Sequence, residues 1–188
     1  MSRDEILRRI KQNKPKLKPL RFEDETAVSS SPSMYKDFIK NLHKVGAKTL
    51  EINEKPDPEL YLLKHYPDAI DFTKEEQKSQ YPPDFSNDKP DKLETIILEG
   101  QFGVSENGAI WLNDFDFQNR IIPFISKHLI IKLKKESLVA NMHEAYKRID
   151  IGNTGFGVFI SGPSKTADIE QSLVYGAHGP VQLFVCLY

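Results

Sequence analysis

The chain has 188 residues, enough for one substantial hydrophobic core, and its 39% hydrophobic and 28% charged residues fit a globular domain. A formal net charge of −1 argues against a nucleic-acid-binding surface, which usually needs clustered basic residues. No apolar run approaches the roughly 18 to 20 residues that span a bilayer, and residues 1–5 do not begin a secretory signal, so we expect a cytoplasmic protein with no membrane partner.

The start of the chain predicts a helix followed by an irregular segment. The pattern over residues 2–12 predicts a helix with Ser2 as its N-cap and a narrow apolar stripe. The proline-containing stretch over residues 14–33 predicts an extended connector, which either clasps a neighbouring subunit or is mobile. We expect residues 1–21 to form an N-terminal helix and connector, and residues 22–188 to form a single α/β domain.

Helical and strand-like patterns alternate through this domain. Helices are predicted over residues 34–45, 57–65, 136–149 and 166–175. Residues 73–92 are predicted to be a loop with room for one helical turn, and residues 119–126 a helical turn interrupted at Pro123. Strands are predicted over residues 47–52, 69–72, 93–98, 109–112, 128–133, 155–161 and 181–187. The alternation implies a mainly parallel sheet with helices on both faces. The last two strands and the helix between them predict one βαβ unit.

Two turns at the ends of that predicted helix hold most of the unusual polar residues. They comprise Gly162, Pro163, Ser164, Lys165, Thr166, Ala167, Asp168, Ile169 and Glu170, followed by Gly176, His178, Gly179 and Pro180. This ordered and spaced pattern resembles the signature of the LUD domain, the domain of lactate-utilisation protein C and its relatives. The resemblance extends from about residue 22 to the C-terminus. It implies the three-layer α/β/α fold shared by glucosamine-6-phosphate deaminase, ribose-5-phosphate isomerase and CoA transferases.

The first turn predicts an anion-binding site. Its candidate residues are Gly162, Pro163, Ser164, Lys165, Thr166 and Glu170. A helix that starts here would present free N–H groups and a positive dipole end to phosphate or carboxylate, and the lysine would strengthen that attraction. The acids at 168 and 170 oppose it, so a capped helix without a ligand is an equal alternative on spacing alone. The resemblance favours a functional turn.

The second turn places a histidine between two glycines. His178 is a candidate general base or anion-binding imidazole, and Gly179 a candidate binding residue; the alternative is a histidine hydrogen-bonded to a neighbouring loop. The five histidines are scattered through the sequence, and no pair has the spacing of a zinc or iron site. We therefore expect no metal.

A third candidate is the polar segment from Ser105 to Gly108, between two predicted strands. It resembles a motif of CoA transferases on the same fold, in which the glutamate attacks an acyl-CoA thioester to form an anhydride and then a glutamyl-CoA thioester. Glu106 is the candidate nucleophile, and Asn107 and Gly108 are candidate binding residues. An ordinary polar turn is the alternative. LUD proteins more often carry Glu-Thr-Gly-Thr here, so Asn107 and Ala109 depart from that form.

An arginine completes the candidate set. Arg120 lies where LUD proteins typically place an arginine, and it could bind a carboxylate with two hydrogen bonds. An arginine at such a position is also typical of an ordinary surface. The two C-terminal turns and the Glu106 turn are expected to form one cleft, with Glu106, Asp168 and His178 as its catalytic candidates.

The resemblance implies a subunit that supports oxidation of L-lactate to pyruvate together with iron–sulfur partner proteins. The one cysteine, Cys186, cannot supply the several thiolates of a cluster, so we expect clusters only in cysteine-rich partners and no cofactor on this chain. The alternative is a stand-alone acyl-CoA or CoA-transferase-like enzyme that uses Glu106. A small enzyme of phosphorylated sugars or folates on the same fold is a third possibility.

Overall fold

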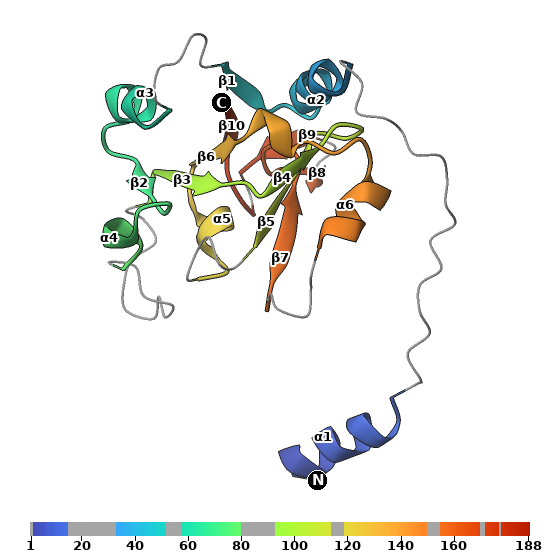
Figure 1. Ribbon diagram of the computed structural model, residues 1–188. Helices are drawn as coiled ribbons and strands as arrows, with labels where there is room; N and C mark the ends of the chain where they lie inside the picture. Colours follow the sequence, from blue (N-terminus) through green and yellow to red (C-terminus); the bar gives the residue numbers. More distant parts are fainter. Residues whose placement is uncertain are drawn as a thin grey trace.

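The computed structural model describes residues 2–14, 33–51, 58–79, 93–113, 119–149, 155–169, 172–176 and 178–188. At its centre lies a five-stranded sheet in which every neighbouring pair is parallel (Figure 1). The order across the sheet is β1 (Lys48–Glu51), β10 (Gln182–Leu187), β6 (His128–Leu133), β3 (Thr95–Glu99) and β2 (Ile70–Asp71). The prediction of an α/β protein with a mainly parallel sheet is confirmed.

The central strand β6 is apolar over Leu129–Ile131 and again at Leu133, because both faces of the sheet are covered there. Leu129, Ile131 and Leu133 belong to one buried cluster, and Ile130 belongs to a second. Consecutive side chains of a strand point to opposite faces, so an unbroken apolar run needs cover on both.

Two helices supply part of that cover. Helix α2 (Ser33–Lys44) places Phe38 and Leu42 in the larger cluster, and helix α3 (Pro58–His65) places Leu62 in the smaller one. The ranges agree with the predicted helices over 34–45 and 57–65.

Three strands form a second sheet, which is antiparallel: β4 (Phe102–Val104), β5 (Ala109–Asn113) and β7 (Gly157–Ile160). Part of this sheet packs into the larger core cluster through Ile110, Leu112 and Ile160. Helix α6 (Met142–Arg148) packs against it through Ala145. The short strand β4 was not predicted from the sequence, and β7 belongs to this sheet instead of the parallel one.

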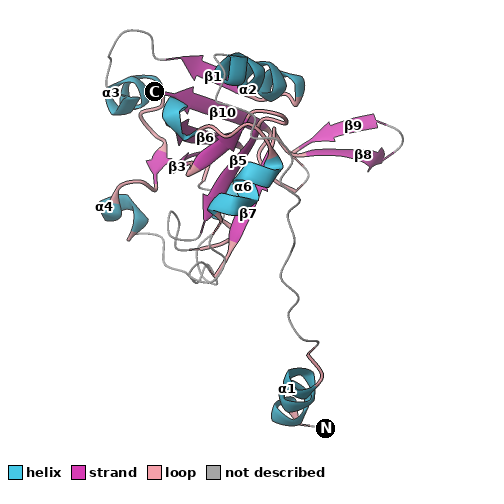
Figure 2. Ribbon diagram, turned by 45° about the vertical axis from the view of Figure 1, so that its right-hand side comes forward, coloured by secondary structure: helices cyan, strands magenta, loops and turns pink. Residues whose placement is uncertain are grey.

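The predicted helix over residues 166–175 is wrong. The segment is an antiparallel hairpin of β8 (Lys165–Ile169) and β9 (Ser172–Tyr175), and Figure 2 shows it projecting from the body of the protein. The predicted βαβ unit is therefore wrong too, because β7 and β10 lie in different sheets. The physical reason lies in the β-branched and aromatic residues of both strands, which favour extended backbone.

The other helices follow the predictions in part. Helix α1 (Arg3–Gln12) confirms the N-terminal helix, and α4 (Glu75–Lys78) and α5 (Ile122–Ile125) are the two expected helical turns. The predicted helix over 136–149 begins as a 3-10 turn, and the α-helix starts only after Asn141, whose side chain caps it. The connector at residues 15–32, and with it the division after residue 21, lies outside the described residues. No helix in the described part is long and apolar enough to cross a membrane.

Candidate functional site

An open hollow of about 540 Å³ lies where the β4–β5 turn meets the end of helix α2 and the start of β8. The hollow contains residues of the Glu106 turn and of the first C-terminal turn, together with residues of α2, but its lining includes no described residue of the second C-terminal turn. It is lined by Asn41, Lys44, Val45, Glu106, Asn107, Ser161 and Lys165.

The β4–β5 turn owes its shape to Asn107 and Gly108. The Asn107 side chain accepts a hydrogen bond from the Ala109 N–H at 3.0 Å, and the Gly108 N–H donates to Val104 O at 2.9 Å. Gly108 has a φ of +68°, a conformation that side-chain-bearing residues rarely adopt. A Cβ at this position would lie 2.8 Å from the backbone nitrogen of Leu42, so the glycine also lets helix α2 approach the turn.

Helix α2 holds the turn through one amide side chain. Asn41 Nδ2 donates to the carbonyl oxygens of Ser105 at 2.7 Å and of Glu106 at 3.1 Å. The contact joins residues more than sixty positions apart in the sequence. These two hydrogen bonds hold the backbone of Ser105 and Glu106 in place against helix α2.

The Glu106 carboxylate already has a structural partner. Its Oε1 accepts the Met142 N–H at 2.8 Å, at the first turn of α6. A carboxylate at this position satisfies a free amide and interacts favourably with the helix dipole. The side chain is nevertheless exposed and lines the hollow. Helix capping alone can therefore explain an acid here, and a hydrogen-bonded carboxylate is a weaker nucleophile.

The Lys165 ammonium binds at the C-terminal end of helix α2. It donates to Val45 O, just beyond the last residue of α2, where unpaired carbonyls carry a negative partial charge. Nearby, Ser161 Oγ donates to Asn107 O at 3.0 Å and ties the end of β7 to the β4–β5 turn. Lys44 is exposed and forms no ion pair with another described residue.

The two C-terminal turns are joined through Ser164. Its N–H donates to Pro180 O at 2.9 Å, its carbonyl accepts the Gly176 N–H at 3.1 Å, and its hydroxyl accepts the His178 N–H at 3.4 Å. Gly179 packs beside it, since a Cβ there would lie 3.2 Å from Ser164 Cβ. The imidazole of His178 is exposed, and no contact of it with the described side chains defines its role.

Arg120 and Thr166 are described by the structure but are not among the residues that line the hollow. Arg120 lies with its guanidinium carbon 5.4 Å from the ring centre of Phe156, just before β7. Thr166 is half-buried within the hairpin, opposite Val174. The positions of the Asp168 side chain and of Glu170 lie outside the described residues. The predicted convergence of Glu106, Asp168 and His178 therefore stays a prediction.

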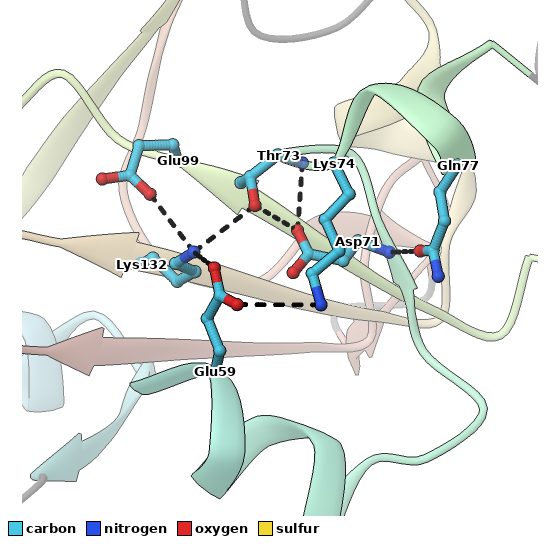
Figure 3. A network of polar contacts seen from close by, with 7 residues as sticks. All are labelled: Glu59, Asp71, Thr73, Lys74, Gln77, Glu99 and Lys132. Carbon is cyan, nitrogen blue, oxygen red and sulfur yellow. Dashed lines mark hydrogen bonds and ion pairs between the residues drawn. The ribbon is translucent and has the colours of Figure 1, made fainter. Parts of the chain in front are cut away.

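Sequence reasoning missed a second polar cluster, at the carboxyl ends of the parallel strands (Figure 3). Lys132 on β6 is only 7% exposed, and its ammonium lies 3.7 Å from Glu99, 4.0 Å from Glu59 and 3.4 Å from the Thr73 hydroxyl. The signal was present in the sequence as a lysine inside an apolar strand. Among the described residues, no group of three or more histidine, cysteine or acidic side chains could hold a metal ion.

Burial governs the titration of two groups beside this cluster. It raises the pKa of the Cys186 thiol to about 11. The pKa of the Tyr188 hydroxyl is also raised, first by burial and then by its hydrogen bond to Glu99. Neither group is ionised at neutral pH, so Cys186 behaves as a core side chain and not as a thiolate nucleophile.

Comparison with known proteins places these observations in context. The family model of the LUD domain matches residues 68–188. Lactate utilization protein C of Bacillus pumilus is 34% identical over 92 residues, covering 46% of this chain and 38% of the relative. Its counterpart in Shouchella clausii is 38% identical over 85 residues, covering 42% and 37%. The chain thus spans less than half the length of the curated relatives it matches.

A solved structure supports the fold. The crystal structure of a DUF162 family protein from Deinococcus radiodurans matches 82% of this chain and 96% of its own, with a TM-score of 0.56 and 15% identity. At this identity the match carries the α/β architecture and nothing about a shared site.

Proposed function

The chain belongs to the LUD domain family, and from that membership we propose that it serves a lactate-utilisation system as a subunit without a redox centre of its own. The observation that carries the proposal is the similarity to relatives named lactate utilization protein C, at 28 to 38% identity over the matched segments. Oxidation of L-lactate to pyruvate releases two electrons. A single cysteine cannot hold an iron–sulfur cluster, so we propose cysteine-rich iron–sulfur partners as the acceptors.

The hollow is the proposed site for a small carboxylate such as lactate or pyruvate. Lys44 and Lys165 contribute two positive charges to its lining and Glu106 one negative charge, so the local balance favours an anion. Ammonium–carboxylate hydrogen bonds are stronger than those between neutral groups. A bound carboxylate would compete with Val45 O for Lys165. The three-layer fold of the sugar-phosphate isomerases and CoA transferases remains the expected architecture around this site.

Growth of the host on L-lactate tests the proposal. Deletion of the gene should abolish that growth, the wild-type gene should restore it, and Lys165→Met should restore it poorly. Lys36→Met, an exposed lysine of the same helix α2 that does not line the hollow, should complement fully. Undiminished growth of the deletion strain on lactate would refute the subunit role.

Direct ligand binding is a separate test of the hollow. Millimolar L-lactate or pyruvate should raise the melting temperature of the wild-type protein by mass action. The rise should disappear in Lys44→Met and Lys165→Met and persist in Lys36→Met. A rise of equal size in all four proteins would exclude the hollow as the binding site.

A second candidate function is acyl or CoA transfer by Glu106, favoured by the exposure of its carboxylate at the hollow. Attack on an acyl-CoA would form a glutamyl anhydride and release the CoA thiolate. The thiolate would then attack the glutamyl carbonyl, break the anhydride, release the acyl group as a free carboxylate and leave the glutamyl-CoA thioester. Hydroxylamine should convert that thioester to a hydroxamate at Glu106, detectable by mass spectrometry. Absence of the adduct after incubation with acetyl-CoA would eliminate this function.

A further inference from the structure

The β8–β9 hairpin forms an arm with no neighbouring strand among the described residues. Its two strands make a sheet of their own, and Figure 2 shows them extending beyond the rest of the fold. An isolated two-stranded ribbon is marginally stable in water, whereas three or more strands can be stable. At its base the arm is anchored by Ser164 and Lys165, and along its length β8 and β9 pair with each other.

The two outer edges of the arm differ in how they resist pairing. In β8 the register shifts by one residue between Thr166 and Ile169, as in a β-bulge, and the strand sequence includes the charged residues Lys165 and Asp168. Bulges and charges are the usual devices that stop an edge strand from pairing. Strand β9, Ser-Leu-Val-Tyr, has no charge, no proline and no extra residue. Its edge is therefore unprotected.

The hydrogen-bond ladder shows which backbone groups of β9 face outward. The Gly176 N–H donates to Ser164 O at 3.1 Å, so residues 164 and 176 face each other at a hydrogen-bonding position of the ladder, although the Ser164 N–H donates to Pro180 O. Hydrogen-bonded and non-hydrogen-bonded pairs alternate in an antiparallel ladder, so Thr166 and Val174 form the next bonded pair. The N–H and C=O groups of Leu173 and Tyr175 consequently point away from β8, toward a free edge.

We propose that β9 pairs, antiparallel and edge to edge, with β9 of a second copy of this chain. Two arms would then form one four-stranded sheet in the order β8–β9–β9–β8. Identical edges are self-complementary about a two-fold axis, so the contact closes on itself. Because β9 contains no charged residue, two copies approach without like-charge repulsion across the new pair. This inference does not depend on the proposed function.

The full-length chain in solution tests the pairing. Light scattering should give about twice the monomer mass of 21.6 kDa at high protein concentration. At that concentration the amide hydrogens of Leu173 and Tyr175 should exchange at least tenfold more slowly than they do in the dilute monomer. Leu173→Lys places a charge on the β9 edge and should yield a monomer with fast amides there, while the matched change Ala167→Lys on β8 should leave the dimer intact.

Three results would overturn the proposal. One is a monomer at every concentration with fast exchange at residues 173 and 175. Another is a dimer that survives Leu173→Lys unchanged, because it must then use a different surface. The third is protection of β9 that requires a different protein, because the edge would then be a docking strand for that partner and not for a second copy.

Discussion

Replacing Gly108 by alanine should destabilise the protein more than a substitution at an ordinary turn. The residue has a φ of +68°, and a left-handed conformation costs a non-glycine residue about 1 to 2 kcal/mol. The new Cβ would lie 2.8 Å from Leu42 N and 3.1 Å from Leu42 Cα, backbone atoms that cannot rotate away. Displacing α2 adds overpacking strain and weakens the two Asn41 hydrogen bonds, so we expect a loss of roughly 3 to 5 kcal/mol in total.

A matched control separates backbone strain from collision. Gly46 also has a positive φ, +92°, but the close contact of a Cβ there would be with the flexible end of the Lys165 side chain, at 3.0 Å, while Pro163 Cδ would lie at an ordinary contact distance of 3.7 Å. Gly46→Ala should therefore lose only about 1 to 2 kcal/mol. Urea unfolding should show both losses as lower midpoints with an unchanged slope. Equal losses for the two variants would refute the close approach of α2 to the turn.

Three further predictions concern other parts of the fold. Lys132→Met should lower the free energy of unfolding by about 2 kcal/mol because the carboxylates around the buried ammonium lose their counter-charge. The control Lys127→Met removes one partner of an ion pair whose two side chains are both 69% exposed, so it should change the free energy of unfolding by less than about 0.5 kcal/mol. Equal urea midpoints for the two variants would contradict this contrast. Glu106→Ala should remove the hydrogen bond that caps the Met142 N–H and lower the free energy of unfolding by about 1 kcal/mol. Glu106→Gln keeps an acceptor oxygen, so it should lower the free energy of unfolding by about half as much or less. Unchanged hydrogen exchange of the α6 amides in both variants would disprove the cap. Because the pKa of Cys186 is about 11 when folded and 9.0 in its ordinary state, the unfolded thiol ionises first, so stability should fall as pH rises from about 9 to about 11. Cys186→Ala should reduce that slope, and rapid alkylation of the native thiol at pH 8 would show that it is not buried.

The parallel sheet could be predicted because its strands are short, apolar and separated by helical patterns. Strands β3, β6 and β10 follow the predicted ranges closely, since burial on both faces makes most of their residues apolar. The arm could not be predicted in the same way. Residues 166–175 have about the right length for a crossover helix, and only the pairing of β7 with β5 shows that no crossover is needed.

The candidate site, too, could be predicted from the sequence only in part. Glu106, Asn107 and Lys165 were singled out as polar residues in turns, and all three line the hollow, although their chemical roles are still predictions. Asn41 and Lys44 were missed because they lie on the polar side of an amphipathic helix and look like solvated surface. Their proximity to the β4–β5 turn depends on the docking of α2, which the local sequence does not encode.

Anaerobic affinity purification of the tagged protein from its own host, grown on L-lactate, is the decisive test of the proposed subunit role. Protein identification and iron analysis of the eluate would follow. The subunit role predicts cysteine-rich, iron-bearing proteins in a fixed ratio to this chain, absent when the host grows without lactate. A protein recovered alone and free of iron under both conditions would contradict the subunit role.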